Sequence, residues 1–308
     1  MRKIIKICAI LCLSLLAACG GSTPSAPATA NPLAGVPTPS LAPEPTDTPS
    51  ALPTMTLLAT ETQAPETATA TVTVSPTEMP IESATAVSTV AGKSVVQTTD
   101  LTIPGAADLP IAATLYNTND TTPRPGIILL HMLNGNRQVW AHNGLAEELV
   151  ANGYVVLALD MRGHGETGAE RDWQLAREDL RLVWQWFADR DDVDAQKTAV
   201  MGGSIGANMA LLLGVDETAV NTVILLSPGS DYMGVKTDGE IAAFAERPLL
   251  IVASQEDSYA ATSSQTLFDL AGANAQLEMY TNAGHGTNML TAEPELTELI
   301  LEWLAEHV

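Results

Sequence analysis

The sequence has few cysteines and few basic residues. Each shortage excludes some kinds of site or partner. All 3 cysteines lie within the first 19 residues, so the rest of the chain can form neither a disulfide nor a thiolate metal site. The chain has 14 Lys and Arg against 36 Asp and Glu, and the counts after residue 92 are 11 and 30. This negative charge argues against nucleic acid and anionic membrane surfaces as partners, and mildly against polyanionic substrates.

The first 19 residues have the pattern of a secretory leader. A basic start precedes an apolar run over residues 7–18, which is too short to span a bilayer as a mature helix. The run ends in Leu16-Ala17-Ala18-Cys19, which resembles the lipobox of bacterial lipoproteins. The resemblance implies that residues 1–18 are a signal peptide and that Cys19 is acylated and becomes the mature N-terminus. We therefore expect an extracytoplasmic protein that its acyl chains alone hold on a bacterial membrane, at the cell surface or the periplasmic face.

Residues 19–92 consist largely of Pro, Thr, Ser and Ala and show no apolar periodicity. Such a segment cannot bury enough apolar surface to fold, so we predict a disordered tether between the anchor and a folded domain. About 70 residues of this composition reach between roughly 50 Å as a coil and 200 Å as polyproline II. Residues 93–308 are then long enough for one domain with a sizeable core.

The remaining sequence alternates between strand-like and helix-like patterns. Two strand-like stretches, 95–103 and 111–116, flank a Pro-Gly turn signal and predict an antiparallel hairpin at a sheet edge. Continuous apolar runs then predict buried parallel strands, with helices between them. This order predicts an α/β fold, a three-layer doubly wound sandwich with a mostly parallel sheet and a substrate site at the carboxyl ends of the strands. The expected strands are 126–131, 154–160, 198–201, 222–226, 248–253 and 276–281, and the expected helices are 138–151, 173–189, 205–213, 263–271 and 293–307.

A serine flanked by glycines follows one of the predicted strands. Gly202-Gly203-Ser204-Ile205-Gly206 lies between the strand ending at residue 201 and the helix starting near residue 205, the strand–turn–helix context that a nucleophilic serine needs. The glycines two before and two after the serine let neighbouring backbone pass close to a sharp turn and leave the hydroxyl exposed. The N–H of Ile205, at the helix N-terminus, points to where a tetrahedral oxyanion would form. We predict Ser204 as the nucleophile and Ile205 as one oxyanion donor.

A serine hydroxyl needs a histidine base, and the base needs a carboxylate that fixes its tautomer. Among 5 histidines, His285 follows the last predicted strand in a loop flanked by glycines. We select it because the chain order in a fold of this kind is nucleophile, acid, base, and only His285 follows Ser204 with a strand before it. The acid is then expected after the strand 248–253, where Glu256 and Asp257 both stand. The remaining histidines are interpreted as a helix-surface residue (His142), a structural turn residue (His164), a residue of the terminal helix (His307) and a residue that follows a strand (His131).

Five motifs, in order, make residues 95–308 resemble the α/β-hydrolase superfamily. The resemblance implies that Asp257 is the acid, with Glu256 as the alternative, and that the N–H of Leu133 is the second oxyanion donor. Met132 stands where that family usually has glycine, so its N–H is the reserve donor. Residues 229–247 leave no room for a cap domain, which indicates the compact dienelactone-hydrolase-like branch. The motifs are His131-Met132-Leu133-Asn134-Gly135, Asp160-Met161-Arg162-Gly163-His164-Gly165, Gly202-Gly203-Ser204-Ile205-Gly206, Gln255-Glu256-Asp257 and Gly284-His285-Gly286.

The resemblance implies a serine hydrolase that cleaves a carboxylic ester, or a related acyl bond, through a triad of Ser204, Asp257 and His285 and an acyl-enzyme intermediate. No metal or organic cofactor is called for, and the expected partner is a small acyl substrate, while protein partners stay open. Two alternatives stay open as well. One is a peptidase or amidase of the same fold, and the other is a non-catalytic hydrolase fold with which a surface lipoprotein binds a ligand.

Overall fold

The computed structural model of the chain describes residues 95–244 and 246–308. The predicted signal peptide, the acylated Cys19 and the tether therefore lie outside the described residues.

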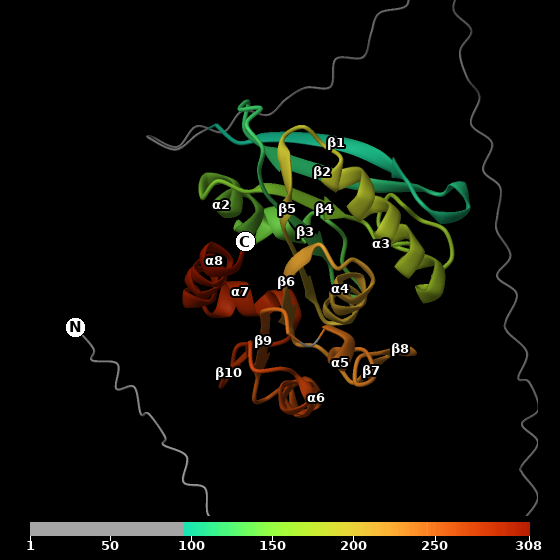
Figure 1. Cartoon of the computed structure of the whole chain (residues 1–308). Helices are drawn as coiled ribbons and strands as arrows, with labels where there is room; N and C mark the ends of the chain where they lie inside the picture. The colour runs from blue at the N-terminus through green and yellow to red at the C-terminus, as the bar shows by residue number, and fades with distance from the viewer. Residues whose placement is uncertain (1–94, 245) are drawn as a thin grey trace, which may run out of the picture. The chain divides into compact units, whose positions relative to one another are not determined.

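An eight-stranded sheet runs through the domain (Figure 1), in the order β1-β2-β4-β3-β5-β6-β9-β10. β1 and β2 form the predicted antiparallel hairpin at one edge, and β2 also pairs antiparallel with β4. The other neighbouring pairs of this sheet are parallel. The strands are β1 (Gln97–Pro104), β2 (Pro110–Asn117), β3 (Arg124–Leu130), β4 (Val155–Leu159), β5 (Val193–Gly203), β6 (Val220–Leu226), β9 (Leu249–Ser254) and β10 (Ala275–Tyr280).

Helices cover both faces of the sheet, which gives three layers (Figure 1). One face carries α1 (Val139–His142), α2 (Leu145–Ala151), α7 (Met289–Ala292) and α8 (Glu295–His307). The other face carries α3 (Trp173–Ala188), α4 (Ile205–Asp216), α5 (Ile241–Phe244) and α6 (Ser258–Leu270).

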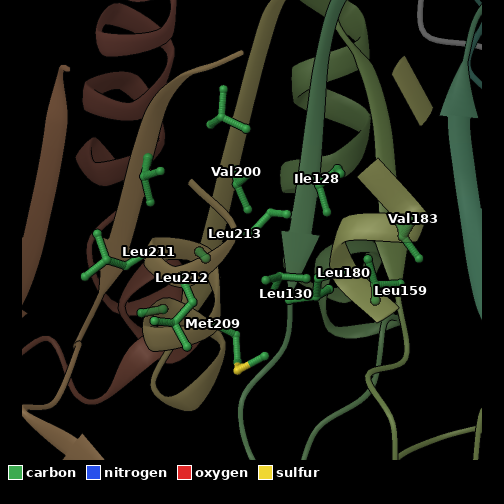
Figure 2. Packing of buried hydrophobic residues seen from close by; sticks show 14 of the residues in the cluster. Ile128, Leu130, Leu159, Leu180, Val183, Val200, Met209, Leu211, Leu212 and Leu213 are labelled. Atoms are coloured by element: carbon green, nitrogen blue, oxygen red, sulfur yellow. The ribbon is translucent and has the colours of Figure 1, made fainter. Parts of the chain in front are cut away.

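Alternate residues of each central strand supply the two cores. In β3, Ile127 and Leu129 belong to the core under α2 and α8, whereas Ile128 and Leu130 belong to the core under α3 and α4. Figure 2 shows the second core, where Ile128 and Leu130 gather with side chains of α3 and α4. A strand buried on both faces has a continuous apolar sequence, which is why these strands could be predicted.

Helix α4, which begins directly after Ser204, is buried along nearly its whole length. Residues 205–214 are all buried, so the helix has no amphipathic stripe. Its N-terminus meets the carboxyl end of β5 in the middle of the sheet. The candidate nucleophile therefore stands at the edge of the sheet where α/β folds bind their ligands.

The predicted fold class is confirmed, and two local predictions need correction. The expected helix 138–151 is two helices, because Gly144 has left-handed backbone (φ 78°) between α1 and α2. The expected helix 263–271 begins earlier, at Ser258, because the side chain of Asp257 caps it. In the segment 229–247, where no cap domain was expected, the described residues form α5 and a small hairpin of β7 (Asp231–Tyr232) and β8 (Val235–Lys236). These elements together are too small for a cap domain.

Two 3-10 turns, η1 (Ala106–Asp108) and η2 (Gly286–Asn288), complete the described elements. Across the two described ranges, no helix has both the length and the apolar character needed to cross a membrane.

Candidate active site

Ser204 occupies a strained turn between β5 and α4. Its backbone angles, φ 55° and ψ −123°, lie in a region that non-glycine residues rarely adopt. The strain is held from the neighbouring strand, because the N–H of Ser204 donates to the carbonyl of Leu226 in β6 at 2.8 Å. The chain thus reverses sharply at the serine, as the glycine pattern predicted.

The two glycines that flank the turn have no room for a side chain. A Cβ on Gly202 would lie 2.1 Å from the carbonyl oxygen of Gly206. A Cβ on Gly206 would lie 2.5 Å from the carbonyl oxygens of both Leu130 and His131, which end β3 and begin the next loop. The glycines therefore let the first turn of α4 pack directly on the backbone of two neighbouring strands.

His285 and Asp257 are brought together from two loops that follow adjacent strands. The Nδ1 atom of His285 is hydrogen-bonded to the Oδ2 atom of Asp257. The other carboxylate oxygen of Asp257 accepts from the N–H of Ala260 at 3.5 Å, at the first turn of α6. Because Nδ1 is engaged by the carboxylate, Nε2 is the nitrogen left to exchange a proton with a serine.

Glu256, the alternative acid, has a different position. Its Oε1 accepts from the N–H of Gly284 at 2.6 Å, and its Oε2 accepts from the hydroxyl of Ser254. The same hydroxyl accepts from the N–H of Ala283 at 2.8 Å. The bond from Ser254 is the main cause that lowers the pKa of Glu256. Glu256 therefore holds the loop that precedes His285, whereas Asp257 contacts the imidazole.

Ser227, which the sequence analysis did not single out, ties the histidine loop to the nucleophile. It follows β6 with a left-handed φ of 53°, and its N–H donates to Val252 of β9 at 2.7 Å. Its hydroxyl accepts from the N–H of Gly286 at 2.9 Å. A Cβ on Gly286 would lie 3.5 Å from the backbone nitrogen of Ser204, so the residue after His285 packs on the turn. The only signal in the sequence is the position of Ser227 directly after a strand next to β5.

Among the described contacts, the hydroxyl of Ser204 and the imidazole of His285 are not hydrogen-bonded to one another. Such catalytic bonds often form fully only when substrate binds. The structure brings together Asp257 with His285, and the loop of His285 with Ser204.

The residues predicted to form the oxyanion hole, Ile205 and Leu133, lie at the start of α4 and in the loop after β3. Ile205 is the first residue of α4, where N–H groups have no partner inside the helix. Leu133 lies in a turn closed by the bond from the N–H of Gly135 to the carbonyl of Met132 at 2.9 Å, and its side chain packs against the core. Within the described contacts, the N–H groups of Leu133 and Met132 donate to no protein acceptor.

Met132 fills the space that two site glycines leave empty. A Cβ on Gly203 would lie 3.2 Å from its Cγ, and a Cβ on Gly286 would lie 2.6 Å from its Sδ. The methionine side chain is thus directed between the nucleophile turn and the histidine loop. Met132 stands where the α/β-hydrolases usually have glycine, and Gly203 and Gly286 leave room for its side chain.

His131 is neutral and buried, and it holds the start of the loop 131–135, which we call the oxyanion loop. Its Nδ1 contacts the carbonyl of Met132 at 2.7 Å, and its Nε2 accepts from the N–H of Met161 at 3.0 Å. These partners require a proton on Nδ1 and none on Nε2. Burial lowers the pKa of His131 to about 4, and the neighbouring His164 acts in the same direction.

This arrangement predicts a loss of stability in acid. The usual pKa of a histidine is 6.5, so the unfolded chain binds a proton to His131 at a higher pH than the folded chain does. The stabilisation is complete above about pH 6.5 and is lost as the pH falls towards 4. Between about pH 7.5 and 4.5, we expect this residue to lower the free energy of unfolding by about 2 to 3 kcal/mol. Urea unfolding of the protein and of His131→Gln, whose amide does not titrate, would measure the difference, and equal pH dependence in both proteins would contradict it.

The motif that begins at Asp160 has a structural role. The buried Asp160 carboxylate accepts from the N–H of Arg137 at 2.7 Å and from the N–H of Glu166 at 2.8 Å, and it pairs with the Arg137 guanidinium. A Cβ on Gly165 would lie 2.1 Å from the same carboxylate. These bonds join the oxyanion loop to the turn after β4, because Arg137 follows that loop.

The other histidines of the chain lie where the sequence analysis assigned them. The Nδ1 atom of His164 contacts the carbonyl of Arg162 at 3.0 Å, inside the turn. His142 is exposed at the end of α1, and His307 packs against Trp303 at the end of α8 with tilted rings whose centroids are 4.1 Å apart. Over the described ranges, no group of three or more His, Cys, Asp or Glu side chains is arranged to hold a metal ion.

Known proteins resemble this chain in part of the sequence and in most of the fold. The family model described as "Serine aminopeptidase, S33" matches residues 121–245, which include Ser204 and end before Asp257 and His285. An uncharacterized protein of Mycobacterium tuberculosis is 24% identical over 249 residues, which are 75% of this chain and 85% of that protein.

Solved structures of esterases and of a dienelactone hydrolase share the fold. An acetyl xylan esterase from Paenibacillus sp. R4 has a TM-score of 0.61 at 14% identity, covering 73% of this chain and 88% of its own. A dienelactone hydrolase from Anabaena variabilis has a TM-score of 0.59 at 16% identity, and the match covers 69% of this chain and 99% of that protein. An esterase from Pyrococcus furiosus has a TM-score of 0.58 at 18% identity, covering 68% and 91%. At such identities, the likeness is one of fold.

Proposed function

We propose that this chain, a member of the α/β-hydrolase superfamily, is a serine hydrolase that cleaves a carboxylic ester through Ser204, His285 and Asp257. The observation that carries the proposal is the strained turn at Ser204 next to the loop on which His285 is hydrogen-bonded to Asp257. A nucleophile, a base and an acid at the carboxyl ends of three strands are the groups that acyl transfer requires.

The proposed reaction proceeds by two displacements at the acyl carbon. The oxygen of Ser204 attacks the carbonyl while Nε2 of His285 takes its proton. The ester C–O bond then breaks as His285 returns the proton to the leaving alcohol, which gives an acyl-serine. Water, deprotonated by the same imidazole, attacks the acyl-serine and releases the acid. Asp257 keeps the proton on Nδ1 and stabilises the imidazolium that forms in each step.

Backbone N–H groups complete the proposed site. The N–H of Ile205 and the N–H of Leu133 would hold the oxyanion of each tetrahedral intermediate, with the N–H of Met132 as the alternative to Leu133. Fixed donors of this kind act at the moment when charge develops and need no reorganisation. The free N–H groups on both sides of the serine support this assignment.

The experiment that tests the proposal is hydrolysis of p-nitrophenyl esters from acetate to octanoate by the purified protein, together with labelling by a fluorophosphonate probe. We expect ester turnover and one covalent adduct on Ser204. A protein that neither turns over esters nor reacts with the probe would instead be the non-catalytic hydrolase fold.

The family match favours one second candidate, a peptidase or amidase that uses the same three residues. Amino-acid p-nitroanilides, assayed beside the esters, separate the two candidates. Ester hydrolysis without anilide hydrolysis supports the esterase, and the reverse supports the peptidase.

We further propose that Cys19 is acylated and that residues 19–92 tether the hydrolase domain to the outer side of a bacterial membrane. The support is the sequence Leu16-Ala17-Ala18-Cys19 after a short apolar run. We expect metabolic labelling with palmitate in the wild type and in the matched variant Cys12→Ser, and none in Cys19→Ser. Labelling that persists in Cys19→Ser would refute the anchor.

A further inference from the structure

The hairpin of β7 and β8 is a well-defined element at the edge of the site. Met233 (φ 54°) and Gly234 (φ 88°) form its two-residue turn, and positive φ at both positions is typical of the type I′ turn that joins short antiparallel strands. The N–H of Gly234 donates to the side chain of Asp231 at 2.7 Å. The hairpin therefore has one defined backbone path despite its small size.

Asn208 anchors this hairpin to the nucleophile helix. The asparagine is fully buried in α4, one helical turn after Ser204. Its Nδ2 donates to the carbonyls of Gly229 and Val235 at 2.9 and 2.8 Å, and its Oδ1 accepts from the N–H of Gly229 at 3.0 Å. Both ends of the hairpin are thus held at a fixed distance from the nucleophile.

Tyr232 is the hairpin residue that contacts the catalytic histidine. Its ring lies perpendicular to the imidazole of His285, with centroids 6.3 Å apart and an angle of 89°. Its hydroxyl donates to the carbonyl of Ser227 at 3.3 Å. A Cβ on Gly229 would lie 2.6 Å from the same ring, so the glycine leaves room for it. The tyrosine is half-buried.

A second tyrosine extends the aromatic surface. The rings of Tyr232 and Tyr259 meet edge to face with centroids 5.5 Å apart. The hydroxyl of Tyr259 accepts from the N–H of Asp231 at 2.9 Å and donates to its carbonyl at 2.8 Å. Tyr259 is 47% exposed, so its ring is held in place while part of it faces solvent. Tyr232 therefore stands beside the imidazole, and Tyr259 packs against the ring of Tyr232.

The carboxylate of Asp257 lies close to this surface, and the hairpin itself carries Asp231 opposite Lys236. Burial raises the pKa of Tyr232, and the nearby carboxylate of Asp257 raises it further, so the hydroxyl keeps its proton at neutral pH. The carboxylate of Asp231, in the hairpin, is exposed. An anionic group against this wall would be repelled, whereas an uncharged aromatic group would gain ring contacts.

We infer that Tyr232 is a specificity-determining residue, whose ring, backed by Tyr259, binds an uncharged aromatic group on the alcohol side of the ester. The inference rests on the proposed function. In that reaction His285 returns a proton to the leaving oxygen, so the alcohol portion must lie against the imidazole, and Tyr232 is the aromatic side chain in contact with that imidazole.

The test compares kcat/KM for benzyl acetate and ethyl acetate in the wild type, Tyr232→Phe and Tyr232→Ala. Both substrates give the same acyl-enzyme, and their difference in leaving-group reactivity cancels when the ratio is compared between proteins. We expect the benzyl-to-ethyl ratio to fall about tenfold in Tyr232→Ala, because the ring contacts are lost. In Tyr232→Phe the ratio should change less than about twofold, because the ring remains. Leu270→Ala, a matched change of an exposed apolar residue at the end of α6, should leave the ratio unchanged.

Two results would overturn the inference. One is an unchanged ratio in Tyr232→Ala, and the other is an equal fall in Tyr232→Phe, which would assign the effect to the hydroxyl. Tyr232→Leu provides a second apolar variant if the alanine variant unfolds, and its ratio should also fall because the aromatic ring is absent. Failure of the proposed function gives a different result, since either the wild type would hydrolyse neither acetate or Ser204→Ala would still hydrolyse both.

Discussion

Replacement of Ser204 by alanine should lower kcat for ester hydrolysis by about 10⁴- to 10⁶-fold and remove all labelling by the fluorophosphonate probe. The variant lacks the oxygen that forms the acyl-enzyme, so the remaining rate would come only from substrate binding and oxyanion stabilisation. Release of p-nitrophenol and mass spectrometry of the probe adduct would measure the two effects.

The same variant should fold as well as the wild type. The strained backbone at position 204 is held by the bond from its N–H to Leu226 and by the flanking glycines, and alanine keeps both. Serine and alanine also adopt a positive φ at similar cost, because both carry a Cβ. The thermal midpoint should therefore change by less than about 3 °C, roughly 1 kcal/mol for a domain of this size. Full activity or full labelling in a folded Ser204→Ala protein would show that another residue is the nucleophile.

Replacement of Asp257 by asparagine should lower kcat by about 10⁴-fold with little loss of stability. The neutral amide cannot stabilise the imidazolium of His285, and it can donate to Nδ1 and so favour the wrong tautomer. Asparagine still accepts a hydrogen bond as an N-cap, so the start of α6 should stay intact. Steady-state kinetics with a p-nitrophenyl ester and a thermal unfolding curve would separate loss of catalysis from loss of fold.

Glu256→Gln is the matched control for that variant. Glutamine keeps an amide oxygen that can accept from the N–H of Gly284, so the loop before His285 should hold its path. We expect kcat to fall by less than about tenfold, because Glu256 contacts the loop backbone and not the imidazole. Equal losses in the two variants, or a larger loss in Glu256→Gln, would assign the acid role to Glu256.

The contrast between neighbouring carboxylates shows how the site is supported. Asp257 contacts His285 and Glu256 contacts Gly284, so two adjacent residues of one loop bind two adjacent residues of another. Ser227 holds the far end of the same histidine loop through the N–H of Gly286. The residues directly before and after His285 are thus each held by a hydrogen bond. Precise proton transfer requires support of this kind.

The nucleophile turn could be predicted from sequence because its cause is local. Gly202 and Gly206 are required by the close approach of backbone at a sharp reversal, and a glycine is visible in the sequence whatever the rest of the chain does. Parallel strands buried on both faces are apolar throughout, so apolar runs such as residues 126–131 could equally be predicted as strands. The order of these features along the chain was enough to determine the fold class.

Tertiary structure alone decided which side chains meet. Asp257 and His285 are 28 residues apart, as are Glu256 and Gly284, and the two pairings differ only in the direction of neighbouring side chains. That direction depends on how α6 begins, and its start at Ser258 was not predicted. The roles of Ser227, Asn208 and Tyr232 were likewise hidden, because each acts through partners that the packing of β6, α4 and the hairpin brings within reach. The sequence by itself determined the fold class and the candidate nucleophile through local steric requirements. Long-range packing decided which carboxylate contacts His285 and which side chains surround it.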